Sequence, residues 1–136
     1  MIVVDTNILV YLWLPSPRNL DAYALVRIDP EWMAPLLWRS EFRNVATGYL
    51  RAGELSLHEI EAATFNAAEC LAGERSVSDA SVFRLASQSK CSAYDCEFVA
   101  LAQLLGTKLV TEDRALLRAF PVVCESLSSA IRGTQP

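Results

Sequence analysis

The chain opens on a short run of β-branched residues that an acid ends. Ile2, Val3 and Val4 are consecutive and apolar, which is typical of a strand buried on both faces. Asp5 follows at once, and a helical pattern of apolar residues begins at Ile8. Because open α/β sheets place their chemistry at the carboxyl ends of parallel strands, this opening predicts a functional acid at the edge of a sheet.

Further short strands alternate with helices along the chain. We expect strands over 31–35, 74–77, 108–111 and 121–124, and helices over 7–14, 19–28, 36–51, 57–72, 79–89, 95–105 and 114–120. Such alternation implies parallel βαβ units. The predicted fold class is therefore α/β, a three-layer α/β/α arrangement with a mostly parallel central sheet in a single domain.

The helix over 57–72 has clear boundary signals. Ser56 and Glu59 have the spacing of a capping box at its start, and Gly73 is expected to end it. Its predicted inward face includes Leu57 and Ala67.

Composition excludes several classes of function. The chain has 136 residues, a formal net charge of −4 and a single histidine, His58, so a ribonuclease built on a histidine pair is excluded. The charge also excludes a generic basic protein that coats nucleic acid. No stretch approaches the roughly 18–20 apolar residues of a membrane span, and no secretory signal is evident, so we expect no membrane association and a cytoplasmic location.

The cysteines have no zinc-ligand spacing, and we expect them to be structural thiols in a reducing compartment. They are Cys70, Cys91, Cys96 and Cys124.

Three aspartates share a position between a strand or connector and a helix: Asp5, Asp95 and Asp113. Each one alone is explained by helix capping, which stabilises a helix by about 1 kcal/mol. Together they are expected to gather at one edge of the sheet, where uncompensated carboxylates raise one another's pKa values. A divalent cation relieves that repulsion, and an all-oxygen site suits Mg²⁺ or Mn²⁺.

Four segments resemble a known family in their order and spacing. They are VVDTN at 3–7, WRSEF at 38–42, SAYDCEFVALA at 92–102 and VTED at 110–113. The chain resembles the PIN-domain nucleases over nearly its whole length, and more narrowly the VapC-type toxins of bacterial and archaeal toxin–antitoxin pairs. The YDxxxxALA block followed by TxD is the most specific part of the pattern.

The resemblance implies a PIN domain over residues 1–132, a tail over 133–136, and a metal-dependent endoribonuclease. The implied catalytic acids are Asp5, Glu41, Asp95 and Asp113, of which Asp5, Asp95 and Asp113 bind Mg²⁺ or Mn²⁺. Thr6, Asn7 and Thr111 are implied to support these acids by hydrogen bonds. The implied partners are an RNA substrate, a cognate antitoxin protein and a second copy of the chain in a homodimer.

Some charged residues near these segments have two interpretations. Arg39, Arg43 and Arg114 are candidates for binding RNA phosphates, and each is otherwise a solvated surface arginine. Glu97 is either an additional site acid or a solvated one.

Two other functions compete with the nuclease. A phosphatase of the haloacid-dehalogenase type also begins with a strand and an aspartate, but it requires a second aspartate where this chain has Asn7. A non-catalytic binding module on the same fold would not need the full set of acids.

Overall fold

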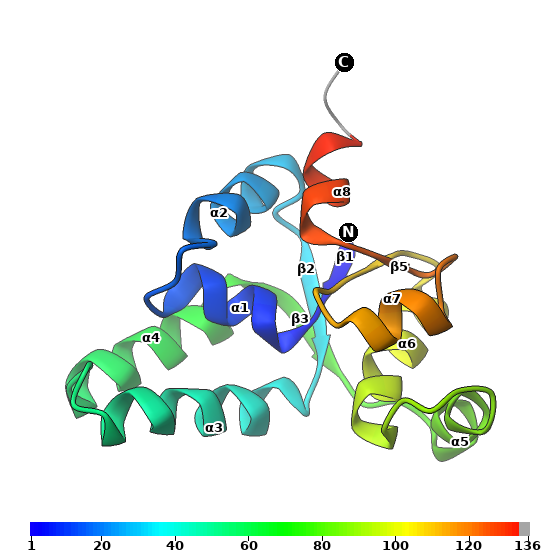
Figure 1. Ribbon diagram of the computed structural model, residues 1–136, viewed down its shortest axis with the longest axis horizontal. Helices are drawn as coiled ribbons and strands as arrows, with labels where there is room; N and C mark the ends of the chain where they lie inside the picture. Colours follow the sequence, from blue (N-terminus) through cyan, green and yellow to red (C-terminus); the bar gives the residue numbers. More distant parts are fainter. Residues whose placement is uncertain (134–136) are drawn as a thin grey trace.

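Five strands form the centre of the structure, a computed structural model in which residues 1–133 are described (Figure 1). They are β1 (Ile2–Val4), β2 (Trp32–Pro35), β3 (Leu71–Arg75), β4 (Leu109–Val110) and β5 (Cys124–Glu125). Their order in the sheet is β3-β2-β1-β4-β5, and every pairing is parallel. The predicted α/β class is confirmed, and the position of β1 in the middle places Asp5 at the centre of the sheet's carboxyl edge.

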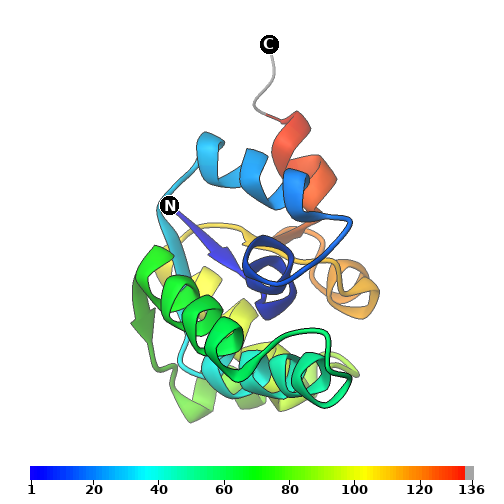
Figure 2. The ribbon, with the colours of Figure 1, turned by 90° about the vertical axis from the view of Figure 1, so that its left-hand side faces the viewer.

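Helices cover both faces of this sheet. They are α1 (Thr6–Trp13), α2 (Asn19–Ile28), α3 (Trp38–Arg51), α4 (Leu57–Cys70), α5 (Asp79–Ser87), α6 (Ala93–Leu105), α7 (Arg114–Ala119) and α8 (Leu127–Arg132). Figure 1 shows α5, α6 and α7 on one side of the strands and α1 to α4 on the other. In the view of Figure 2, α2 and α8 lie together above the sheet, and the two helices pack against each other.

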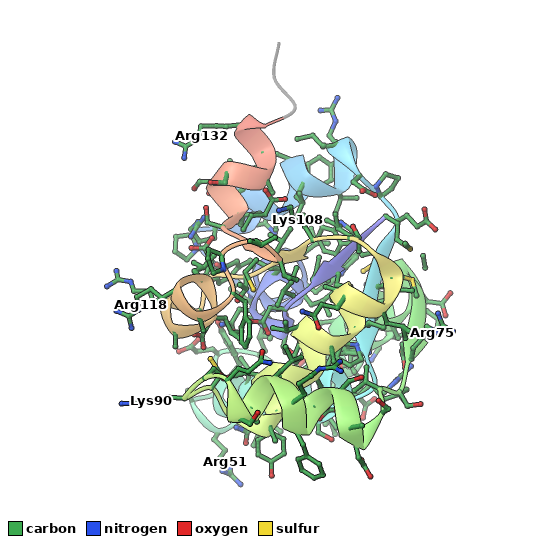
Figure 3. The ribbon with its side chains drawn as sticks, turned by 90° about the vertical axis from the view of Figure 1, so that its right-hand side faces the viewer. Arg51, Arg75, Lys90, Lys108, Arg118 and Arg132 are labelled. Carbon is green, nitrogen blue, oxygen red and sulfur yellow. The ribbon has the colours of Figure 1, made fainter. Side chains whose placement is uncertain are left out.

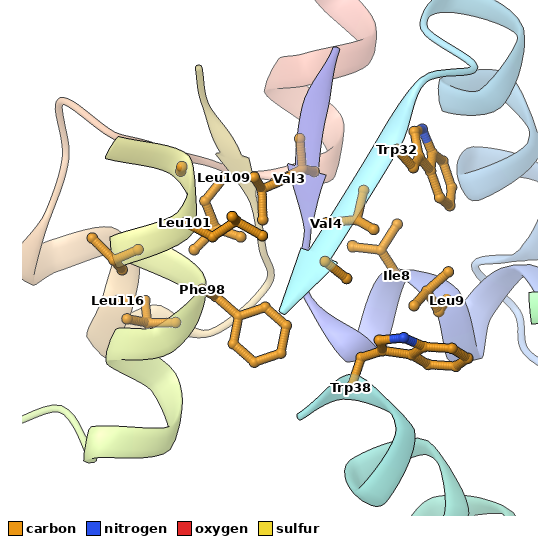
Figure 4. Packing of buried hydrophobic residues seen from close by; sticks show 14 of the residues in the cluster. Val3, Val4, Ile8, Leu9, Trp32, Trp38, Phe98, Leu101, Leu109 and Leu116 are labelled. Carbon is orange, nitrogen blue, oxygen red and sulfur yellow. The ribbon is translucent and has the colours of Figure 1, made fainter. Parts of the chain in front are cut away.

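The core holds the tip of β1 rigidly in place. Val3 and Val4 are fully buried, with Ile8 and Leu9 of α1 on one side and Phe98 of α6 on the other (Figure 4). Trp38 at the start of α3 is also fully buried and contacts Phe42 edge-on. Apolar packing on both faces thus fixes the backbone from which Asp5 projects.

The α4–β3 region differs from the prediction. The capping box of Ser56 and Glu59 is present, but α4 ends at Cys70 and Gly73 lies inside β3. A Cβ at Gly73 would lie 2.8 Å from Cε of Met33 on the neighbouring strand, so this glycine leaves room for the Met33 side chain. Leu57 is 59% exposed, and Ala67 is the residue of α4 that is fully buried.

The C-terminal region also differs. The last strand begins at Cys124, after a turn that follows Phe120, and the additional helix α8 was not predicted. Ser126 caps α8 by accepting a hydrogen bond from the Ser129 amide. Most of the predicted tail, residues 134–136, lies outside the described residues.

Two further predictions concern cysteines and membranes. The four cysteines are free thiols, and Cys96 and Cys124 are buried. Within residues 1–133, no helix combines the length and apolar character that crossing a bilayer requires.

Candidate active site

Asp5 is the most buried acid of the site. It is the N-cap of α1 and is 8% exposed. Its Oδ1 accepts a hydrogen bond from the Thr6 amide at 2.7 Å, and its Oδ2 accepts one from the Thr111 hydroxyl at 2.6 Å. The side chain is therefore fixed by residues that follow two adjacent strands, β1 and β4.

Glu41 approaches Asp5 from the first turn of α3. Its Oε1 accepts a hydrogen bond of 2.7 Å from the hydroxyl of Thr6, whose amide binds Asp5. Thr6 thus connects two acids that are 36 positions apart in the sequence, with its backbone on one and its side chain on the other.

Asp95 and Asp113 come from the starts of two neighbouring helices. The N-cap of α6 is Ser92, which accepts a hydrogen bond from the Asp95 amide at 3.0 Å, so the helix begins two residues before its predicted start and Asp95 does not cap it. Asp113 does cap α7, because its Oδ1 accepts from the Leu116 amide at 3.0 Å. The Asp113 amide in turn donates to the Thr111 hydroxyl at 3.0 Å, which joins Asp113 to Asp5 through a single side chain.

Burial and the charges of neighbouring acids raise the pKa values of Asp5, Glu41 and Asp95. Burial is the main cause that raises the pKa of Asp5 to about 6; the hydrogen bonds from Thr111 and Thr6 oppose it, and the charges of Glu41 and Asp95 add to it. The pKa of Glu41 is raised chiefly by burial and further by the charge of Asp95. Burial and then the charge of Asp113 raise the pKa of Asp95. The charge of at least one neighbouring acid therefore acts on each of these three carboxylates.

No basic side chain within residues 1–133 forms an ion pair with any of the four acids. The ion pairs of Arg18 and Arg39 use other acids: Arg18 binds Asp21 and Glu112, and Arg39 binds Glu74. The negative charge of the site is thus uncompensated by the described residues.

The carboxylate oxygens of the site are the type of ligand that a hard divalent cation prefers, but the four side chains do not converge on one position. No three His, Cys, Asp or Glu side chains in the described part converge closely enough to hold an ion. Oε2 of Glu41 and Oδ2 of Asp113 have no hydrogen-bond donor within residues 1–133. Carboxylate oxygens that accept no hydrogen bond, beside the buried carboxylate of Asp5, match the oxygen ligands that Mg²⁺ and Mn²⁺ prefer.

The remaining predicted residues have distinct surroundings. Asn7 is exposed and makes no hydrogen bond to these acids in the described region, so its supporting role stays a prediction. Glu97 is half-buried, and burial and then the charge of Glu41 raise its pKa, which places it near the site's border. Arg43 and Arg114 are exposed, whereas Arg39 binds Glu74 at 2.7 and 3.0 Å and stacks on Trp38.

Glu112 is the residue that sequence reasoning missed. Its Oε1 accepts a hydrogen bond from the Leu127 amide at 2.7 Å, and its Oε2 lies 3.5 Å from Nη1 of Arg18. It therefore ties the segment between β4 and α7, which carries Thr111 and Asp113, to the start of α8. Nothing in the local sequence signals this contact, because it depends on a helix that the pattern did not predict.

Comparisons with known proteins agree with this architecture. A family model described as the PIN domain matches residues 2–120. Ribonuclease VapC3 from Pyrobaculum aerophilum is 31% identical over 130 residues, which cover 90% of this chain and 96% of that protein.

Two solved structures have a similar fold. The crystal structure of PAE2754 from Pyrobaculum aerophilum has a TM-score of 0.78 and 17% identity, covering 97% of this chain and 87% of its own. That of FitAcB from Neisseria gonorrhoeae has a TM-score of 0.67 and 17% identity, covering 94% of this chain and 99% of its own. At this identity the two structures establish similarity of fold.

Proposed function

Since this chain belongs to the PIN-domain family, we propose that it is a metal-dependent endoribonuclease and the toxin of a toxin–antitoxin pair. The observation that carries the proposal is the buried Asp5, which shares its surroundings with Glu41 and Asp95 and has no basic partner among residues 1–133. The similarity to a ribonuclease over 90% of the chain supports RNA as the substrate.

Asp5, Asp95 and Asp113 are the residues that would hold Mg²⁺ or Mn²⁺, with Glu41 at the same site. A bound divalent ion supplies an activated water and charge stabilisation at the phosphoryl oxygens. Thr6 and Thr111 hold Glu41 and Asp5 in orientation through hydrogen bonds of 2.7 and 2.6 Å. They also stabilise the deprotonated form of each carboxylate, which is the form that binds a cation.

RNA would approach the carboxyl edge of the sheet, and two arginines lie close to the acids in the sequence, Arg43 two residues after Glu41 and Arg114 directly after Asp113. Arg43 and Arg114 are exposed and available to phosphates. Arg39 donates two hydrogen bonds to Glu74, so we expect it to contribute less to RNA binding than Arg43 and Arg114.

We further propose a homodimer and inhibition by an antitoxin protein. Exposed apolar side chains on and beside α3 and α4 supply contact surface for protein partners: Leu36, Leu50, Leu57 and Phe65. Light scattering of the purified chain, alone and co-expressed with a candidate antitoxin, tests both partners.

The nuclease proposal is tested with purified protein and a labelled RNA in Mg²⁺, in Mn²⁺ and in chelator. Cleavage is expected with either metal and is expected to be lost in Asp95→Asn. Asp79→Asn is the matched control, because Asp79 also lies in the first turn of a helix but is exposed, and its charge is not among the causes that raise the pKa values of Asp5, Glu41 and Asp95. Absence of cleavage by the wild type in either metal would overturn the proposal. Phosphate release from small esters without RNA cleavage would instead support the phosphatase.

A further inference from the structure

We propose that Lys90, Arg114, Arg118 and Tyr94 form a binding track for single-stranded RNA on the α6–α7 side of the site. The inference rests on the proposed nuclease function and extends it to residues that determine how the strand is held.

The three cations flank the acids by their position in the fold. Arg114 directly follows the α7 cap Asp113, and Arg118 lies one helical turn further on, about 6 Å along the axis. Residues four apart lie on the same side of a helix, so both arginines line one flank. Lys90 lies in the turn between α5 and α6, two residues before the cap of the helix that carries Asp95.

Figure 3 shows the Lys90 and Arg118 side chains projecting from the same edge of the molecule, with Arg75 on the opposite edge. In Figure 1, α6 and α7 lie on the same side of the strands. The starts of α6 and α7 are close enough for the charge of Asp113 to raise the pKa of Asp95. The cations therefore border the acids on one side.

These cations are also free to bind phosphate. All three are exposed, and none forms an ion pair with an acid within residues 1–133, in contrast to Arg18 and Arg39. In a chain of net charge −4, a polyanion is repelled by the acids of the site. Unpaired cations beside the acids counter this repulsion where the strand must pass.

Tyr94 makes the track specific for unpaired bases. It is 64% exposed and directly precedes Asp95 in the first turn of α6. An exposed aromatic ring is a stacking surface for a base that is not paired in a duplex.

The test measures binding of a labelled single-stranded RNA to the Asp5→Asn protein over a series of KCl concentrations at fixed Mg²⁺. Each phosphate contact in a single strand contributes about 0.7 to the slope of log affinity against log salt. Replacing Lys90, Arg114 and Arg118 together by Gln is therefore expected to lower the slope by about 2. Arg75→Gln, an exposed cation on the opposite edge, is expected to leave the slope unchanged. Tyr94→Ala is expected to weaken binding roughly 5- to 150-fold, and Tyr94→Phe to retain it.

The outcomes separate this inference from the nuclease proposal. If the wild type cleaves RNA but the triple variant keeps its salt slope and its KM, the track is refuted and the nuclease stands. If the wild type does not cleave but the slope falls as expected, the track stands without the nuclease. An Asp5→Asn protein that does not bind RNA at all refutes the track.

Discussion

The hydroxyl of Thr111 donates a 2.6 Å hydrogen bond to Oδ2 of Asp5, across the ends of the adjacent parallel strands β1 and β4. The same hydroxyl accepts a hydrogen bond from the Asp113 amide at 3.0 Å. One fully buried side chain thus orients two of the acids that we assign to the site.

Thr111→Val is expected to impair cation binding while it preserves side-chain shape. The substitution removes the hydrogen bond that lowers the pKa of Asp5, so this carboxylate should deprotonate only at higher pH. Loss of a residue that supports a metal ligand typically costs 10- to 100-fold in affinity or activity, and we expect about that loss at neutral pH. Calorimetric titration with Mg²⁺ at several pH values measures it.

Thr111→Ser keeps the hydroxyl and is the control. It should bind Mg²⁺ over the wild-type pH range. Equal binding by the Val and Ser variants would show that the hydrogen bond has no part in holding the site.

Asp5→Asn should change how stability depends on pH. The folded-state pKa of Asp5 is raised from 3.8 to about 6, so its contribution to stability is fully present below pH 4 and is lost as pH rises through about 6. A shift of about two units corresponds to about 3 kcal/mol. In chelator, the free energy of unfolding of the wild type should therefore fall relative to that of Asp5→Asn by about that amount between pH 4 and pH 7.

Urea unfolding of both proteins across this range measures the difference. Mg²⁺ at pH 7.5 should then stabilise the wild type more than Asp5→Asn, because the cation binds the folded, deprotonated state. A difference between the two proteins that does not vary with pH would contradict the assigned cause.

The sequence contains enough information to locate Asp5 in the fold. The run Ile2–Val4 forms the central strand, with Val3 and Val4 fully buried, and Asp5 must then lie at the carboxyl edge. The same reasoning places Asp113 at this edge, because it comes shortly after the buried strand β4. Local patterns also set the boundaries of α2, which begins and ends at the predicted residues.

Local patterns fail where tertiary contacts decide. Gly73 resembles a helix stop, yet it lies in β3, where the sheet pairs it with Met33 of β2. The start of α6 is set by Ser92, a better-placed cap than Asp95, which leaves the Asp95 carboxylate for the site. Bonds such as Thr6 to Glu41 join segments that only the folded sheet brings together, and no local pattern encodes them.

Thr6→Val is expected to affect Glu41 while it leaves the Asp5 cap intact. The variant loses the hydroxyl that donates to Oε1 of Glu41 but keeps the amide that binds Asp5. Without that donor the pKa of Glu41 should rise further, and RNA cleavage at neutral pH should fall about 10- to 100-fold. In a plot of cleavage rate against pH, the rise on the acid side should shift to higher pH in Thr6→Val. Thr6→Ser should return it to the wild-type pH. Full activity of Thr6→Val would show that RNA cleavage does not depend on the hydrogen bond by which Thr6 orients Glu41.

Glu112→Ala should destabilise the region that connects the site to α8. Glu112 accepts a hydrogen bond from the Leu127 amide at 2.7 Å, and Leu127 is fully buried. Removing the acceptor leaves a partly buried N–H unsatisfied, which costs about 1–3 kcal/mol. Glu112→Gln retains an acceptor oxygen and loses only the interaction with Arg18, a partly exposed pair worth about 0.2–1 kcal/mol.

Urea unfolding should therefore rank the proteins as wild type, Glu112→Gln and Glu112→Ala in order of decreasing stability. Hydrogen exchange should locate the change at the Leu127 amide and in the segment 111–113, since both are held by this one side chain. Where Glu112→Ala lowers the hydrogen-exchange protection of segment 111–113, it should also lower the rate of RNA cleavage, because Thr111 and Asp113 are then no longer held in position. If Glu112→Ala is as stable as Glu112→Gln, the hydrogen bond to Leu127 does not hold the segment, and Asp113 is positioned by its helix cap and its hydrogen bond to Thr111.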